Sequence, residues 1–123
     1  MKKLILPLLC LVSLISCEND SNDAKPTSVV LANQSVTPVL LTKKAGFENV
    51  ELFSLISSDD VLAGSPKFVF GGSADGSGLL RNEDGTFTFL VNHEDNFAVS
   101  RVTLDKTFKP LKGEYLLNSD GGF

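Results

Sequence analysis

Residues 79–91 read LLRNEDGTFTFLV and give the clearest indication of the fold class. Between its two apolar runs, the four residues 82–85 form a polar loop that ends in Gly85, a residue suited to positive φ. The side chains of residues 86–91 then alternate, with one face formed by Phe87, Phe89 and Val91 and the other by Thr86, Thr88 and Leu90. Alternation with a period of two is typical of a β-strand. The stretch therefore predicts a β-hairpin.

On both sides of this hairpin, most of the chain has a β pattern. We predict strands on its C-terminal side over 97–104 and 113–117, and on its N-terminal side over 36–41, 50–56 and 67–70. Asp84-Gly85 and Asp105 have the composition of turns. No segment after the first seventeen residues has a sustained helical period. The predicted fold is all-β, an antiparallel meander.

Two segments before the hairpin have other expected conformations. Ser58 is suited to cap one short helical turn over 59–63. Residues 71–78 contain four glycines in eight positions, which predicts a loop whose backbone can approach a ligand or another chain closely.

The apolar residues of the predicted strands suggest a sheet that is covered on both faces. Phe87 and Phe89 are expected on one face, Leu90, Val102 and Leu104 on the other, and Phe97 in the core. Two-sided apolar strands need cover on both sides, as in a sandwich or between neighbouring blades of a β-propeller. Because a domain over 29–123 is small for that task, we expect it to be the incomplete N-terminal part of a longer protein.

The first sixteen residues predict a lipoprotein signal peptide. Lys2 and Lys3 precede an apolar run over 4–15 that is too short to span a bilayer, and Ser16 stands directly before Cys17. This ending resembles a bacterial lipobox, whose cysteine is lipidated and becomes the new N-terminus. An ordinary buried helix and a standard secretory cleavage are the alternatives. We interpret Cys17 as a lipid anchor that holds the protein at a membrane.

Residues 17–28 are polar and rich in acidic side chains, which predicts a flexible tether. An acidic stretch behind the lipidated cysteine resembles the surface-export signals of some Bacteroidetes lipoproteins. The expected location is therefore the outer membrane, either its periplasmic face or the cell surface.

Charge and cysteine content narrow the classes of ligand. The chain has 11 basic and 15 acidic residues and a net charge of −4. Removal of Lys2 and Lys3 with the leader changes the net charge to −6. Without a basic run, nucleic acid is not an expected partner. Cys10 lies in the leader and Cys17 carries lipid, so the mature chain offers no thiolate to a metal. An acidic chain is better suited to cations such as calcium.

A polar cluster follows the strand of the hairpin, in the order Asn92, His93, Glu94, Asp95, Asn96. Such a cluster is usually a solvated turn, but it is also a possible metal site, and the residues alone leave both readings open. His93 is the only histidine, so no second imidazole exists to share an ion. We expect it to hydrogen-bond a neighbouring loop.

The stretches FVFGGSADGSG, DGTFTFLVNHEDN and AVSRVTLDKTFKPLKGEYLL resemble the PhoX-like alkaline phosphatase family. In that family a glycine-rich loop with Asp-Gly precedes a strand that ends in Asn-His-Glu, matched here by Asp75-Gly76 and by residues 92–94. The resemblance covers about 50–122. It implies the first blade of a β-propeller phosphomonoesterase that uses calcium and iron on a phosphate ester substrate. Glu94 and Asp75 then become candidate metal ligands, with Asn92 in a supporting position.

The chain departs from the family at one important point. The iron site of the family uses a cysteine and acidic residues from later blades, which are missing here, so no residue of this chain is expected to be catalytic. The function predicted from the resemblance is an N-terminal part of an exported metal-dependent phosphatase-like lipoprotein that is inactive alone. The alternative is a small non-enzymatic surface lipoprotein that acts as a β-rich binding module.

Overall fold

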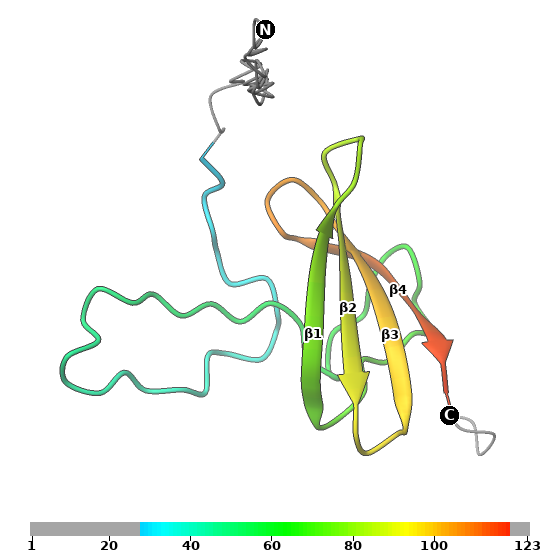
Figure 1. Cartoon of the computed structure of the whole chain (residues 1–123), viewed down its shortest axis with the longest axis horizontal. Coiled ribbons are helices and arrows are strands. Elements are labelled where there is room, and N and C mark those ends of the chain that lie inside the picture. Colours follow the sequence, from blue (N-terminus) through cyan, green and yellow to red (C-terminus); the bar gives the residue numbers. More distant parts are fainter. Residues whose placement is uncertain (1–27, 119–123) are drawn as a thin grey trace, which may run out of the picture.

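The structure, a computed structural model, describes residues 28–118 and contains one four-stranded antiparallel sheet (Figure 1). Its strands are β1 (Ala74–Arg81), β2 (Phe87–His93), β3 (Ala98–Leu104) and β4 (Pro110–Leu117). They pair in chain order, β1-β2-β3-β4, which confirms the predicted all-β meander. The predicted signal peptide and the lipid-anchor cysteine lie outside the described residues. Within 28–118, no helix is long and apolar enough to cross a membrane.

The hairpin between β1 and β2 forms as its sequence predicts. The N–H of Asn82 donates to the carbonyl of Thr86 at 2.9 Å, and Gly85 has a φ of +82°. Asp84 Oδ1 accepts from the N–H of Thr86 at 2.9 Å and from its hydroxyl at 2.6 Å. The side chain of the aspartate thus replaces a backbone partner inside the turn, as short polar residues commonly do.

The turn between β3 and β4 has the same chemistry, whereas the turn between β2 and β3 brings a correction. Asp105 Oδ1 accepts from the N–H groups of Thr107 at 2.7 Å and Lys109 at 3.0 Å, which confirms the predicted turn. Phe97, predicted in the core, instead lies in the β2–β3 turn with a φ of +48° and 81% of its surface exposed. Its position is set by the turn, which points the ring to solvent despite its apolar character.

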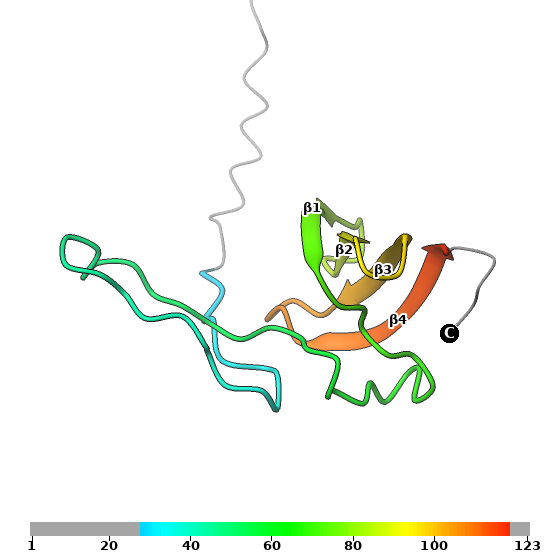
Figure 2. The same cartoon turned by 90° about the horizontal axis from the view of Figure 1, so that it is seen from below.

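One face of the sheet forms the core, and the register decides which residues belong to it. Val102 lies opposite Phe89 and Leu104 opposite Phe87, so these four side chains share a face. The expectation that Val102 and Leu104 point away from the phenylalanines is therefore wrong. The chain segment 55–72, green in Figure 2, passes along this face and covers it. It contributes the buried side chains Leu62, Phe68 and Phe70.

The three early strands predicted at 36–41, 50–56 and 67–70 are not formed, and the predicted helical turn over 59–63 is absent from the described chain as well. Residues 36–54 make an extended arm that projects beside the sheet in Figure 1, and 67–70 run as an irregular part of the cover. Residues 58–67 contain turns and an isolated bridge between Leu62 and Ser65. Apolar β-branched runs favour strands only where a partner strand satisfies their backbone, and within 28–118 none is offered to these runs.

The glycine-rich stretch 71–78 is the converse case. Its composition predicts a loop, but Ala74–Arg81 is strand β1, paired with β2 through a register shift between Ala74 and Ser77. Glycine weakens a strand without forbidding it. Here the hairpin turn and the regular alternation of β2 impose the pairing on residues with little strand preference of their own.

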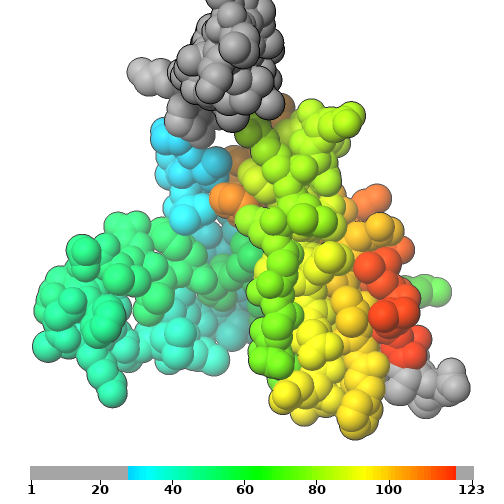
Figure 3. All heavy atoms as spheres, viewed as in Figure 1, coloured from blue at the N-terminus to red at the C-terminus, as the bar shows by residue number. Residues whose placement is uncertain are grey.

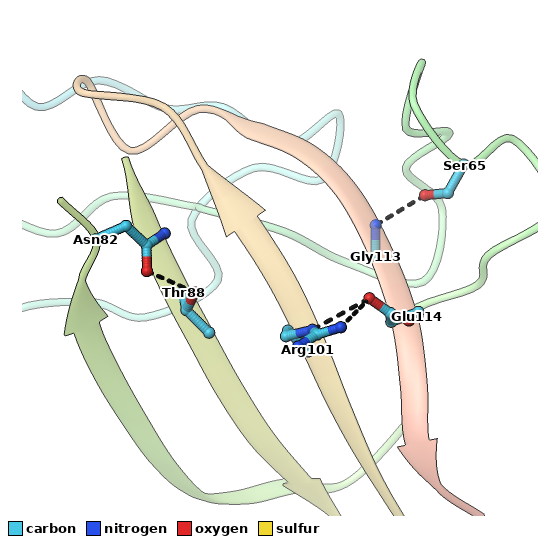
Figure 4. A network of polar contacts seen from close by, with 6 residues as sticks. All are labelled: Ser65, Asn82, Thr88, Arg101, Gly113 and Glu114. Carbon is cyan, nitrogen blue, oxygen red and sulfur yellow. Dashed lines mark hydrogen bonds and ion pairs between the residues drawn. The ribbon is translucent and has the colours of Figure 1, made fainter. Parts of the chain in front are cut away.

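Side-chain contacts across the sheet add to these pairings (Figure 4). The Thr88 hydroxyl donates to Asn82 Oδ1 at 3.1 Å, beside the hairpin turn. Arg101 on β3 donates to Glu114 Oε1 on β4 at 2.6 Å and 3.1 Å. Because both side chains are about half exposed, at 44% and 52%, this ion pair adds little to stability.

Candidate functional site

The pairing of β1 with β2 brings the two polar motifs of the sequence to one end of the sheet. Ala74, which precedes Asp75, lies opposite His93, and the N–H of Glu94 donates to the carbonyl of Ser73 at 3.1 Å. The backbones of the predicted candidates Asp75, Asn92 and Glu94 are thus close together across the β1–β2 pair. In the sequence, 17 or more positions separate Asp75 from the other two.

The side chains of these three candidates are exposed. None makes a hydrogen bond or ion pair with another residue of the described chain. In the part of the protein that the structure describes, no three His, Cys, Asp or Glu side chains gather closely enough to hold a metal ion. Calcium takes six to eight oxygen ligands. The described residues therefore supply fewer ligands than a calcium ion takes.

His93 differs from the residues on either side of it, because it is completely buried. Its Nε2 shares a hydrogen bond of 2.7 Å with the hydroxyl of Ser100, which is buried on β3. The partner is thus on a neighbouring strand and not, as expected, in a loop. The ring of Phe70 meets the imidazole edge-on at a centroid distance of 4.8 Å. His93 is therefore an internal part of the sheet end that carries Asn92 and Glu94.

Nδ1 of His93 is a buried polar atom without a hydrogen-bond partner in the described chain. The backbone at Gly71 passes so close to the ring that a Cβ there would lie 2.8 Å from Nδ1 and 2.7 Å from Asn96 Nδ2. At Gly72 a Cβ would lie 2.7 Å from Asp95 Oδ2. These two glycines allow the backbone to pack closely against the β2–β3 end of the sheet. The glycine pattern correctly indicates a close approach of the backbone, but what it approaches here is the chain's own side chains.

Tyr115 joins this end of the sheet to the covering segment. Its hydroxyl donates to the carbonyl of Val69 at 2.8 Å and accepts from Asn96 Nδ2 at 3.2 Å. Burial raises the pKa of Tyr115, and the hydrogen bond from Asn96 opposes that shift. The ring also packs against Phe68, with centroids 5.3 Å apart. The tyrosine thus stays neutral and ties the cover to β4 and to the β2–β3 turn.

A second polar cluster anchors the base of the arm, far from Glu94 in the sequence. Asp60 accepts from the Ser35 hydroxyl at 2.6 Å, from the N–H of Val36 at 2.8 Å and from the N–H of Ser57 at 2.7 Å. Desolvation alone would raise the pKa of Asp60, but these hydrogen bonds outweigh it and lower the pKa. The Ser57 hydroxyl is a fourth donor, at 3.2 Å. A carboxylate that these internal donors already engage is a structural clamp.

Open depressions of the surface lie elsewhere. One of about 500 Å³ lies on the arm, and another of about 480 Å³ lies where the covering segment meets β4, lined by Ser65, Pro66, Lys67, Phe68, Gly113 and Glu114. Neither includes a predicted metal ligand. The side chains of the candidates at the β1–β2 end face solvent.

Comparison of the chain with protein-family models, with curated proteins and with solved structures finds no match.

Proposed function

We propose that this chain supplies a blade of a β-propeller to an exported, metal-dependent phosphomonoester hydrolase of the PhoX-like type. The observation that carries the proposal is the pairing of Ala74 with His93. It sets the Asp75-Gly76 motif beside the Asn92-His93-Glu94 motif, and these are the two motifs on which the resemblance rests. Two motifs can contribute ligands to one metal site only if their backbones lie close together, as these two do.

The architecture of the sheet supports the assignment as a blade. Propeller blades are four-stranded sheets arranged around a central channel. The meander here has four strands in chain order and exposes apolar side chains on both terminal strands, namely Leu79, Leu80, Leu116 and Leu117. Neighbouring sheets would cover them. In this proposal the remaining blades are a required partner of the chain.

The proposed role of Glu94 and Asp75 is to present hard oxygen ligands to calcium or iron at the end of the sheet. Carboxylates suit both ions, and Asn92 would support the site through its amide or carbonyl. The ligands that the described residues lack would come from other blades. No residue of this chain is proposed to be catalytic. Bound metal would polarise the phosphate ester, and the chain would contribute to placing that metal.

The proposed location is the outer membrane, on its periplasmic face or at the cell surface, with lipid on Cys17 as the anchor. The support is the leader sequence, in which Ser16 precedes Cys17 after an apolar run. Residues 17–28 would act as the tether between membrane and sheet.

The test is a substitution in the protein expressed from its complete reading frame. Glu94→Gln keeps the shape of the side chain and removes its charge, so metal content and phosphomonoesterase activity should fall together. We expect the activity to fall roughly tenfold or more, since a lost ligand contact commonly costs at least ~1.4 kcal/mol of transition-state stabilisation. Glu83→Gln, in the exposed hairpin loop, is the matched control and should leave both unchanged. Near-native activity in both variants would reduce residues 92–94 to a solvated turn.

A non-enzymatic binding module is the second candidate. Two observations favour it: residues 28–118 gather no set of three metal-ligating side chains, and the arm exposes the apolar side chains Val36, Leu40, Leu41, Phe47, Val50 and Phe53. Under this reading, the reading frame stops at codon 123 and the lipid-free chain unfolds in one cooperative transition. Further blades encoded after codon 123 would instead support the hydrolase.

A further inference from the structure

The two edges of the sheet differ in how they are covered. At the β4 edge, the N–H of Gly64 donates to the carbonyl of Leu111 at 3.0 Å, and the N–H of Gly113 donates to the Ser65 hydroxyl at 2.7 Å (Figure 4). The covering segment thus satisfies part of this edge. β1 pairs with β2 alone within the described chain, and all eight of its residues are exposed. Figure 3 shows β1 as a continuous column on the molecular surface.

The backbone groups that face this open edge follow from the hairpin. Because the N–H of Asn82 bonds to Thr86 on the β2 side, alternation turns the backbone of Leu80 and Gly78 toward β2. The N–H and C=O groups of Ser77, Leu79 and Arg81 then point outward. Such an unpaired row is a template for another strand. β1 contains neither lysine nor proline, which commonly protect edges, and its irregularity is confined to the part between Ala74 and Ser77.

We propose that β1 pairs antiparallel with β1 of a second copy of this chain, about a two-fold axis at Gly78. In this register Gly78 faces its own counterpart, and Ser77 faces Leu79 of the other copy. Both members of the latter pair have outward backbone groups, so the two strands can exchange hydrogen bonds. A symmetric interface of this kind uses the same surface on both copies.

Charge selects this register from its neighbours. Counted along the strand, it sets Asp75 of each copy, in the irregular part of β1 between Ala74 and Ser77, near Arg81 of the other copy. One interface would then contain two opposite-charge contacts. Neither side chain has an ion-pair partner within the described residues, and both are exposed. A shift by one register step toward the hairpin loop sets Asp75 against Glu83, and the opposite shift sets Arg81 against Ser73. Only the proposed register gains attraction at both ends.

The small residues of β1 also suit close pairing. Gly76 and Gly78 have no heavy atom within 4 Å of the position that a Cβ would occupy, so nothing stands over the strand at these points. The inference goes beyond the proposed function and does not depend on it. Asp75 is also a proposed metal ligand, and the tests below therefore measure association and not hydrolysis.

The first test uses cysteine cross-linking of the full chain in detergent under mild oxidation. Residues that face each other across a non-hydrogen-bonded antiparallel pair have Cα atoms about 4.5 Å apart, within the range of a disulfide. Gly78→Cys should therefore give a covalent dimer, and Leu80→Cys, which would face Gly76, should not. The wild-type chain, with Cys10 and Cys17, sets the background. Absence of a Gly78→Cys dimer, or equal cross-linking of Leu80→Cys, would overturn the inference.

The second test reverses the charges, with sedimentation as the readout. Asp75→Arg and Arg81→Asp should each weaken the dimer by roughly two- to thirtyfold, because two exposed ion pairs become two repulsions. The double variant Asp75→Arg/Arg81→Asp restores complementarity and should regain the affinity of the wild type. A double variant as weak as the single ones, or a wild-type chain that stays monomeric at micromolar concentration, would overturn the proposed pairing.

Discussion

Among the glycines of residues 28–118, Gly113 on β4 is expected to be the least tolerant of a side chain. It is buried, and a Cβ at this position would lie 2.3 Å and 2.4 Å from two ring atoms of Phe68. Real carbon atoms do not approach so closely, so Gly113→Ala must move the ring. Phe68 is 9% exposed and packs against Tyr115, which leaves it little room inside the core.

The cost of Gly113→Ala can be bounded from these contacts. Overpacking a core commonly costs about 1–3 kcal/mol, and loss of the burial of a phenylalanine costs about 1.5–3 kcal/mol. Replacing glycine by alanine in a strand recovers about 0.5–1 kcal/mol of backbone entropy. We therefore expect the free energy of unfolding to fall by about 0.5–2.5 kcal/mol. In a domain of this size, each kilocalorie lowers Tm by roughly 4–8 °C.

Urea unfolding followed by far-ultraviolet circular dichroism measures this loss. Gly76→Ala is the matched control, because no heavy atom lies within 4 Å of its Cβ position. In a Phe68→Ala background the cost of Gly113→Ala should largely vanish, since the clashing ring is gone and contacting residues are not additive. Equal stability of Gly113→Ala and Gly76→Ala would show that Phe68 does not restrict the space at Gly113.

Two further predictions concern the arm and the leader. The folded pKa of Asp60 is lowered, so the stability that its carboxylate contributes is present above the unfolded value of about 3.9 and is lost as the pH falls through the folded value. Asp60→Asn should cost about 1 kcal/mol at pH 7 in thermal unfolding and flatten the loss of stability below pH 4, whereas an unchanged acid profile would exclude Asp60 as the clamp that binds Ser35 and Ser57. Labelled palmitate should enter the wild-type protein and be absent from Cys17→Ala, and equal labelling of both would remove the proposed lipid anchor.

The parts of the structure that could be predicted were those set by local chemistry. Asp84-Gly85 and Asp105 form turns because short polar side chains bond nearby backbone groups, and that information lies within a few residues. The alternation over 86–91 likewise indicated β2. Local patterns misled where pairing was absent: residues 36–41 and 50–56 have strand composition but no strand partner in the described chain.

The sequence predicts which polar residues could belong to the candidate site, but not how they are arranged in space. Asn92 and Glu94 are polar residues at the end of β2, as expected, but their sequence does not say that Asp75 lies beside them. That neighbour relation depends on Ala74 pairing with His93, a contact between distant positions. The burial of His93 was also hidden, since it arises from Phe70 and from strands β3 and β4.

The turns, the strand character of β2 and the class of fold follow from local sequence, because each depends on interactions between near neighbours in the chain. The other features depend on long-range contacts. These contacts make a strand of the glycine-rich stretch around Gly76, and they place Val102 on the same face as Phe89. The physical reason is that strand pairing and burial join segments far apart in the chain. Backbone hydrogen bonds across that distance overrule the weak preference of any single residue.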